Sequence, residues 1–280
     1  MIDETKSDYE LLQGAPLGTL RTAIRSGNYQ GHTAGLARGQ LQCNLAILPQ
    51  EFAGDFLTYC QNNPKPCPLA GVSKPGEPVI ETLGADLDLR TDVPLYNVYR
   101  EGTLIEQVPD LLAFWRDDLV AFAIGCSFTF ERALMDNGIA MRHIDLDVTV
   151  PMFRTSIQTT PCGPFGGGMV VSMRPIHRSD IDRTIALSGK YPLAHGAPVQ
   201  IGAPSEIGVE DLFSPDWGAA VPIGEDEIPV FWACGVTPQS AVMRAGLSVC
   251  ITHTPGAMLI TDIDEFANTA EFTQPNHSIQ

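Results

Sequence analysis

The chain has 280 residues, of which 44% are hydrophobic and 18% are charged, a balance typical of a globular protein with a substantial core. Its 33 acidic residues outnumber 17 basic ones, giving a formal net charge of −16. Such a surface repels a phosphate backbone and no basic run offsets it, so we expect no nucleic-acid partner. No apolar run approaches the roughly 18 residues that suggest a membrane span, so we expect no membrane partner either.

The cysteines indicate a reducing compartment. There are seven of them, an odd number, spread from Cys43 to Cys250 without a closely spaced framework. The amino terminus is polar and acidic, unlike a signal peptide or an Arg-rich transit peptide. We therefore predict free, mostly buried thiols and a cytoplasmic protein.

The first half of the chain predicts a helix, a hairpin and a buried strand. Apolar side chains on one face favour a helix over 50–60, which ends before a proline-rich segment. Residues 96–100 and 103–108 are typical of paired strands. The continuously apolar run 119–124 suggests a strand covered on both faces, followed by a turn at 125–127 and a helix over 128–137.

The same strand–glycine–helix pattern occurs again near the carboxyl end. Residues 229–234 predict a strand, Gly235 a turn, and Thr237 the N-cap of a helix that continues to about residue 245. In open α/β sheets, ligands bind beyond the carboxyl ends of the strands, where helix N–H groups favour anions. We therefore expect Gly125 and Gly235 at the ends of two strands of one sheet, facing a shared cleft.

Residues 151–225 are rich in glycine and proline. They contain a predicted strand over 169–173, a helix with capping-box spacing from Ser179, and a strand near Val199. We therefore predict an α/β fold with a mixed or mostly parallel sheet core covered by helices. Segments 1–150 and 226–280 would form this core, and 151–225 a smaller inserted α+β domain.

The turn before the 128–137 helix gathers three reactive side chains. Cys126 offers a thiol, Ser127 a hydroxyl and Glu131 a carboxylate, as a nucleophile elbow would. The pattern is equally typical of a buried structural cysteine, a serine N-cap and a carboxylate near the helix dipole. Flanking aromatic residues would raise the pKa of Glu131, while the helix terminus would lower it.

Three arginines are candidates for binding a substrate carboxylate, because a guanidinium can hold a carboxylate with two parallel hydrogen bonds. They are Arg90, Arg154 and Arg174. An ordinary surface ion pair with Asp88 or Asp92 would also account for Arg90, and the other two carry the same ambiguity.

His195 and His253 occupy predicted loops, where functional residues often lie, although lone loop histidines more often only form hydrogen bonds. No H-E-x-x-H motif, paired C-x-x-C motif or D-x-D cluster is present, so we expect no dedicated metal site. The sequence identifies no cofactor and leaves a loosely bound divalent cation as an open alternative.

Several long motifs, read together and in order, resemble the hydro-lyase family that includes the D-glutamate cyclases. The resemblance spans nearly the whole chain. The matching segments are 31–35, 42–44, 63–68, 90–94, 115–118, 125–131, 150–155, 170–175, 195–198, 229–239 and 251–256. Gln200 and Ala203 depart from the family pattern, which often has His and Asp at these positions, and an altered substrate choice is one consequence.

The resemblance implies a lyase that acts on a small carboxylate, with D-glutamate cyclisation to 5-oxo-D-proline as the model reaction. For that reaction we assign carboxylate anchoring to the helix terminus at Thr237–Gln239, helped by Arg154 or Arg90. The turn at Cys126–Ser127 would stabilise the oxyanion. Glu131 and Asp92 are the first candidates for proton transfer, with His195 and His253 next.

Two other functions stay open at this point. One is a cysteine- or serine-dependent acyl hydrolase or amidotransferase built on Cys126 and Ser127, which would pass through a covalent adduct. The other is a noncatalytic amino-acid-binding protein that uses the same two helix termini. A homo-oligomer is compatible with either reading.

Overall fold

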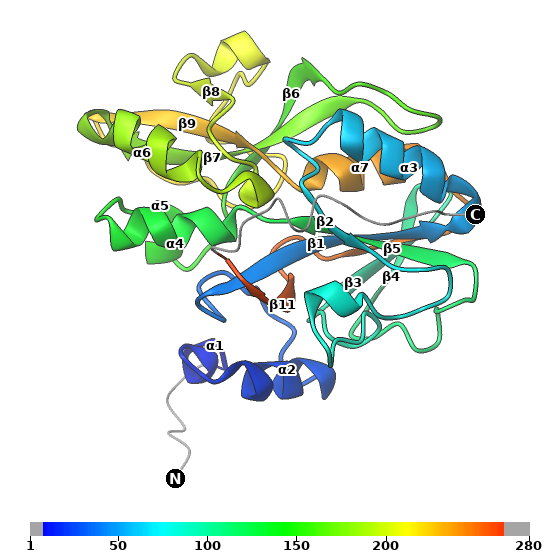
Figure 1. Cartoon of the computed structure of the whole chain (residues 1–280). Helices are drawn as coiled ribbons and strands as arrows, with labels where there is room; N and C mark the ends of the chain where they lie inside the picture. Colours follow the sequence, from blue (N-terminus) through cyan, green and yellow to red (C-terminus); the bar gives the residue numbers. More distant parts are fainter. Residues whose placement is uncertain (1–7, 266–280) are drawn as a thin grey trace.

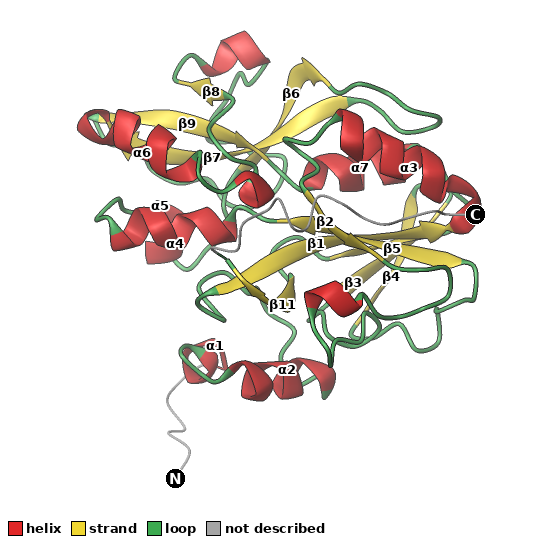
Figure 2. Ribbon diagram, viewed as in Figure 1, coloured by secondary structure: helices red, strands yellow, loops and turns green. Residues whose placement is uncertain are grey.

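The computed structural model of the chain describes residues 8–265 and contains two antiparallel β-sheets with helices between and around them (Figures 1 and 2). The larger sheet has the strand order β2-β5-β1-β10-β3-β4, and β11 also pairs with β1. Its strands are β1 (Gln40–Pro49), β2 (Leu69–Val72), β3 (Tyr96–Arg100), β4 (Thr103–Val108), β5 (Leu119–Gly125), β10 (Cys250–His253) and β11 (Leu259–Asp264).

Strand β1 lies at the centre of the larger sheet. It pairs with β5 from Cys43↔Gly125 to Pro49↔Leu119, and with β10 on its other side. Helices α3 (Gln50–Asn62) and α7 (Val236–Arg244) cover one face of this sheet, where Phe56 and Val242 pack into a core with Phe122. The segments around 80–93 and 108–115 cover the other face.

The smaller sheet has four strands in the order β6-β7-β9-β8. They are β6 (Met152–Gln158), β7 (Gly168–His177), β8 (Gln200–Ile201) and β9 (Glu227–Ala233). Strand β9 pairs with β7 from Val171↔Ala233 to His177↔Glu227. The division of the chain into domains at 150 and 225 stays a prediction.

Helices α4 and α7 lie between the two sheets (Figure 1), and α7 contacts strands of both. The α-helices are α1 (Asp8–Leu12), α2 (Leu17–Arg25), α3 (Gln50–Asn62), α4 (Phe128–Asp136), α5 (Arg142–Asp145), α6 (Ile181–Ser188) and α7 (Val236–Arg244). Residues 8–265 also form short 3₁₀ helices, which are η1 (Glu81–Leu83), η2 (Arg178–Asp180), η3 (Pro192–Ala194) and η4 (Pro204–Ile207).

The predicted mixed or mostly parallel sheet is wrong, because every strand pair in both sheets is antiparallel. The apolar run 119–124 is indeed buried throughout, as strand β5. An apolar run of this kind reports that both faces of a strand are covered, and it carries no information on strand direction. The expectation that Gly125 and Gly235 follow strands of one sheet is also wrong, since β5 and β9 belong to different sheets.

The individual elements agree better with the sequence than the sheet does. The predicted hairpin strands match β3 and β4 at both ends, and the helices predicted over 50–60 and 128–137 correspond to α3 and α4. All seven cysteines are free thiols, and none of the described helices combines the length and apolarity required to cross a bilayer.

Candidate active site between two strand–helix turns

The first turn connects β5 to α4, and its backbone lies against η3. A Cβ atom on Gly125 would lie 1.7 Å from the carbonyl oxygen of Leu193. No side chain fits there, so glycine is required at this position. Cys126 and Ser127 follow, and Ser127 is the residue immediately before α4.

The second turn connects β9 to α7 and approaches the first across strand β1. A Cβ atom on Gly235 would lie 2.2 Å from Nδ2 of Asn44. That same Nδ2 donates hydrogen bonds to the carbonyl oxygens of Ile124, at 3.2 Å, and Gly125, at 3.0 Å. Asn44 therefore links the two turns, because it binds the backbone of one and packs under the glycine of the other.

The two turns line one pocket, as the sequence predicted, although they follow strands of different sheets. Its polar lining residues are Asn44, Cys126, Ser127, Thr149, His195 and His253, together with the thiol of Cys234. No lining residue is Asp, Glu, Lys or Arg. In a chain with net charge −16, this pocket is a region without carboxylates.

His195 is held in the tautomer of a proton acceptor. Its Nδ1 lies 2.9 Å from the carbonyl oxygen of Lys65, which can only accept, so Nδ1 carries the proton and Nε2 has a free lone pair. Burial lowers the pKa of His195 to about 4, although the Lys65 hydrogen bond opposes this shift. The imidazole is therefore neutral at pH 7. The backbone of His195 has a φ of 70°, in the left-handed region that residues other than glycine rarely adopt.

His253 is also buried and neutral, but it is held differently. The backbone N–H of Leu45 donates to Nδ1 at 3.0 Å, and the carbonyl oxygen of Leu45 lies 3.4 Å from the same nitrogen. The side-chain amide of Gln239, on α7, lies 2.8 and 3.1 Å from the two ring nitrogens. Burial lowers the pKa of His253 to about 4.

Both thiols in the pocket are protonated at neutral pH. Burial raises the pKa of Cys126 to about 12, even though the backbone N–H of Phe128 favours the thiolate. Burial likewise raises the pKa of Cys234 to about 11. A nucleophilic thiolate needs the opposite environment, one that lowers its pKa.

A buried ion pair between Arg174 and Glu131 contacts the hydroxyl of Ser127. Arg174, on β7, is fully buried and donates through Nε to Glu131 at 2.9 Å and through Nη2 to both Glu131 and the Ser127 hydroxyl. Its guanidinium also lies over the rings of Phe130 and Trp232, at 5.1 and 5.3 Å.

Glu131 is ionised in this arrangement. Burial alone would raise the pKa of Glu131, but the charges of Arg174 and His143 lower it to about 2. His143 Nε2 lies 3.2 Å from the same carboxylate oxygen, without the direction of a hydrogen bond. Glu131 does not line the pocket between the turns, and its assigned part in proton transfer stays a prediction.

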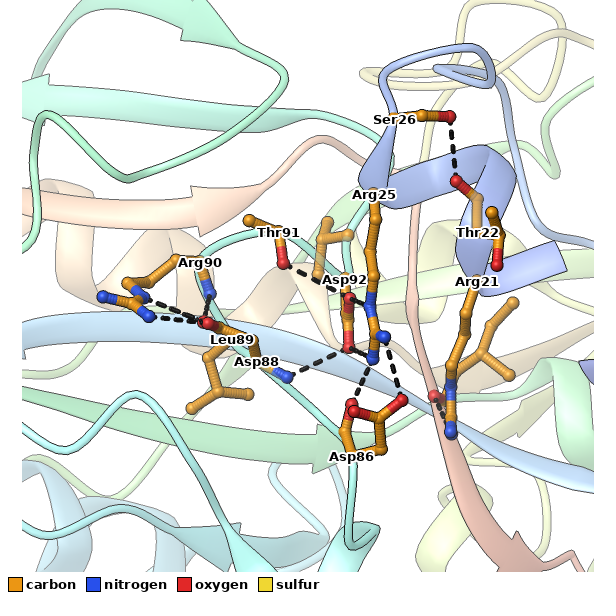
Figure 3. Close-up of polar contacts among 12 residues, drawn as sticks. Arg21, Thr22, Arg25, Ser26, Asp86, Asp88, Leu89, Arg90, Thr91 and Asp92 are labelled. Atoms are coloured by element: carbon orange, nitrogen blue, oxygen red, sulfur yellow. Dashed lines mark hydrogen bonds and ion pairs between the residues drawn. The ribbon is translucent and has the colours of Figure 1, made fainter. Parts of the chain in front are cut away.

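Asp92 and Arg90 form polar contacts with each other's neighbours in the segment 86–92 and with α2, as Figure 3 shows. Asp92 is buried and accepts hydrogen bonds from Nε and Nη2 of Arg25, on α2, at 2.5 and 2.8 Å. Arg90 holds the carboxylate of Asp88 with two nitrogens, at 2.9 and 2.7 Å. Neither residue lines the pocket, so the structure does not bring them together with the histidines.

Arg154 and Thr237 also have partners away from the pocket. Arg154 is exposed, forms an ion pair with Asp216 and lies 4.5 Å from the ring of Trp217. The Thr237 hydroxyl accepts from the backbone N–H of Val170 at 2.9 Å and ties α7 to β7 instead of capping the helix.

The two positions that depart from the family pattern lie beside β8. Gln200 donates to Glu206 at 3.0 Å, and Ala203 has a φ of 41° before η4. Across residues 8–265, no group of three or more His, Cys, Asp and Glu side chains is arranged to hold a metal ion.

Two functional candidates were missed by the sequence reasoning. Cys234 is the last residue of the predicted strand 229–234. It lines the same pocket as Cys126 only because the two turns meet in the folded chain. Asn44 was seen only as part of a motif, within a segment not predicted as a strand. The polar residues Gln42 and Asn44 inside an otherwise apolar run were the available signal.

The comparisons with known proteins identify relatives of this chain. A family model described as D-glutamate cyclase matches residues 120–262. A protein from Dinoroseobacter shibae named "Putative hydro-lyase" is 56% identical over 92% of this chain and 86% of its own length. Proteins with the same description from Ruegeria pomeroyi and a Jannaschia species are 58% and 54% identical, over 92% and 91% of this chain and 94% and 96% of their own.

Among solved structures, a nitrogen repressor-like protein from Methanococcus jannaschii aligns over 86% of this chain and 96% of its own. Its TM-score is 0.38 and its identity is 11%, and at that level it carries no argument about this chain. The relatives and the family model decide the assignment: the chain belongs to the D-glutamate cyclase family.

Proposed function

We propose that the pocket between the two turns is the active site of a hydro-lyase that acts on a small carboxylate. The model reaction is the cyclisation of D-glutamate to 5-oxo-D-proline with loss of water. The observation that carries this proposal is the convergence of two helix N-terminal turns and two neutral imidazoles on one pocket without a charged lining residue.

The pocket suits a carboxylate for two reasons. The N-termini of α4 and α7 present backbone N–H groups, which favour an anion. The lining also contains no carboxylate that would repel it. Anchoring by Arg90 or Arg154 receives no support from their positions, so we assign it to the two turns.

Two neutral imidazoles are available in the pocket for the proton transfers. In the cyclisation, the amino nitrogen bonds to the side-chain carboxyl carbon, a C–O bond breaks, and the two protons lost by the ammonium leave with the oxygen as water. His195, with a bare Nε2, can accept a proton from the ammonium. His253 lines the same pocket and is the candidate that transfers a proton to the departing oxygen.

The other residues of the turns position the reacting groups. The backbone N–H groups around Ser127 and Val236 can stabilise the tetrahedral oxyanion. Arg174 holds the Ser127 hydroxyl at 3.0 Å and is itself fixed by Glu131, which makes Arg174 and Glu131 positioning residues.

Substrate entry requires movement at the mouth of the pocket. The cavity measures about 30 Å³, room for one or two water molecules. Met152 and Met258 line it, and methionine side chains rearrange readily because they are unbranched. We infer that these two side chains move when a ligand enters.

The protonated state of Cys126 weighs against the covalent alternative. A thiol whose pKa is raised to about 12 is a poor nucleophile at pH 7. The Ser127 hydroxyl receives a hydrogen bond from Arg174, which would not act as a general base. A noncatalytic binding protein would use the same pocket without turnover, and only a reaction assay separates the two.

The proposal is tested by incubating the purified protein with D-glutamate and following 5-oxoproline by NMR. We expect product to form faster than in buffer, and formation to slow by about 10²- to 10⁴-fold in His195→Gln. Related hydroxy acids are assayed in parallel, because the pocket fixes the substrate class more firmly than the substrate. Binding of D-glutamate without product would support the noncatalytic reading and contradict the proposal. Cytoplasmic location stays a prediction, and self-association and a loosely bound divalent cation stay open alternatives.

A further inference from the structure

A proline-rich loop, residues 63–68, contacts two parts of the pocket between the turns. The carbonyl oxygen of Pro68 accepts a hydrogen bond at 2.8 Å from the backbone N–H of Gly125, where the first turn begins. The carbonyl oxygen of Lys65 lies 2.9 Å from Nδ1 of His195. The loop therefore binds both the first turn and the imidazole proposed as the proton acceptor, although the proposed reaction uses none of the loop's side chains.

The other end of this loop is also fixed. Nδ2 of Asn63 donates to the carbonyl oxygens of Tyr59 and Thr160, both at 2.8 Å, and Oδ1 of Asn63 accepts from the backbone N–H of Thr160 at 2.8 Å. Every second residue of the loop is proline, whose ring fixes φ. The backbone at Lys65 is therefore positioned before any ligand binds.

The ammonium group of Lys65 has no counter-ion in the described part of the chain. The side chain is half-buried, and its burial lowers the pKa of the ammonium group. No carboxylate among residues 8–265 forms an ion pair with it or opposes that shift. Removing a cation from water costs free energy unless an anion comes close. An unpaired, half-buried ammonium group in a chain with net charge −16 therefore favours an anionic ligand.

The charge of Lys65 is close enough to act on a residue of the pocket. Burial is the largest cause of the low pKa of His195, and the positive charges of Arg174 and Lys65 lower it further. Arg174 is already paired with Glu131, whereas Lys65 is unpaired among residues 8–265. Lys65 is therefore a cation beside the pocket that is available to a carboxylate of the ligand.

We propose that Lys65 is a specificity-determining residue that binds the second carboxylate of a dicarboxylate substrate. The two turns would hold one carboxylate through backbone N–H groups, and Lys65 would pair with the other beside His195. The substrate class then narrows from small carboxylates to small dicarboxylates, of which D-glutamate is one. The proposal rests on the proposed use of this pocket, but it concerns binding and does not require the cyclisation.

The test measures the binding of a dicarboxylate that cannot cyclise. The full chain carries ¹³C-labelled methionine methyl groups, because Met152 and Met258 line the pocket and report on its occupation. Glutarate is titrated alongside valerate, which has the same carbon chain with a single carboxylate. We expect glutarate to shift the signals of Met152 and Met258 and to bind at least about tenfold more tightly than valerate, because it alone can pair with Lys65.

Substitutions of Lys65 locate the contact. Lys65→Met keeps most of the side-chain length and removes the charge, so glutarate should bind at least about tenfold more weakly while valerate binds as it does to the wild type. Lys65→Arg keeps a positive charge and should retain most of the glutarate affinity. Lys74→Met is the matched control, since Lys74 pairs with Glu77 at the surface and should leave both affinities unchanged. If Lys65→Met does not fold, Lys65→Gln decides the question.

Three results would overturn the proposal. The first is that glutarate binds Lys65→Met as tightly as the wild type. The second is that Lys65→Met weakens glutarate and valerate equally, which would mean that the loop only supports His195. The third is that glutarate leaves the signals of Met152 and Met258 unshifted. A protein that forms 5-oxoproline from D-glutamate but binds glutarate independently of Lys65 would keep the proposed function and lose only this assignment.

Discussion

Two buried carboxylate–arginine pairs occupy different parts of this molecule and invite different conclusions. Glu131 pairs with the fully buried Arg174, which also holds the Ser127 hydroxyl at the edge of the pocket. Asp92 pairs with Arg25, whose side chain is 31% exposed, and joins α2 to the segment around residue 88. The comparison teaches that a buried ion pair is not by itself a functional site. The further contact of the arginine distinguishes the two pairs. Arg174 also binds Ser127, which lines the pocket, whereas Arg25 binds no residue of the pocket.

The largest expected effect is on turnover, which should depend on the residues of the pocket and not on the Asp92–Arg25 pair. His195→Gln removes the acceptor nitrogen, so turnover should fall by about 10²- to 10⁴-fold while the fold is retained. Asp92→Asn lies outside the pocket and should leave turnover within a few-fold of the wild type. Assays of both variants after confirming their folded state check this. Equal losses of turnover in the two variants would contradict the claim that only the pocket takes part in the reaction.

The two ion pairs should also differ in their contribution to stability. Arg174→Met leaves Glu131 as a buried unpaired charge, which should lower the free energy of unfolding by about 3–5 kcal/mol. Arg25→Met should cost less, about 1–3 kcal/mol, because Asp92 keeps a hydrogen bond from the backbone N–H of Asp88. Urea unfolding of both variants measures the difference, and the reverse order would contradict our reading.

Glu131→Gln tests whether this carboxylate transfers a proton or positions Arg174 and Ser127. A proton-transfer group at this position would lose about 10²- to 10⁴-fold in turnover when replaced by glutamine. Because Glu131 has its pKa lowered to about 2 and faces Arg174, we expect a smaller loss, about tenfold, from a displaced Ser127. The pH profile of turnover should keep its shape. A profile that loses one limb would restore Glu131 as a proton-transfer residue.

Cys126→Ala tests the covalent reading with a smaller expected effect. A protonated thiol that only lines the pocket should be replaceable with a loss of no more than about tenfold. Mass spectrometry of the wild-type protein incubated with substrate should find no adduct on Cys126. A trapped adduct together with an inactive alanine variant would favour the acyl-transfer mechanism.

The pH dependence of stability gives the smallest effect. His195 and His253 have pKa values lowered to about 4 from an ordinary value of 6.5, so they stabilise the fold above pH 6.5 and this contribution is lost as the pH falls toward 4. Each contributes a slope of up to about 1.4 kcal/mol per pH unit in that window. Glu265 has its pKa raised from 4.5 to about 7, so its contribution to the free energy of unfolding increases as the pH falls from 7 to 4.5. This increase offsets the loss from one imidazole.

The net result is a loss of stability on the order of 1 kcal/mol per pH unit between pH 6.5 and 4.5. Urea unfolding at three pH values measures it. The His253→Gln variant should lose most of the net slope. A stability that rises as the pH falls through this window would mean that the imidazoles are not buried as neutral groups.

The sequence predicted single elements well and their assembly poorly. The glycines at 125 and 235 and the apolar runs before them fixed the positions of β5, α4, β9 and α7 to within a few residues. Strand direction was not predictable, because burial on both faces produces the same apolar run in parallel and antiparallel sheets.

The candidate site was likewise predictable only in part. His195, His253, Cys126 and Ser127 were identified as candidates, and the structure brings them to one pocket. The link through Asn44 is a tertiary contact between β1 and two turns that are far apart in the chain, so local pattern could not reveal it. Whether Arg90 or Arg174 had a partner next to the pocket was undecidable for the same reason.

The central claim, that both turns form one site for a small carboxylate, has a direct test in the methionine methyl signals. Met152 and Met258 line the pocket between the turns, whereas Met173, inside the smaller sheet, serves as an internal control. Titration of the full chain with 5-oxo-D-proline should shift the signals of Met152 and Met258 together, leave Met173 unchanged, and lose affinity in His195→Gln. Saturable binding that leaves both Met152 and Met258 unshifted, or no binding at all, would contradict the claim.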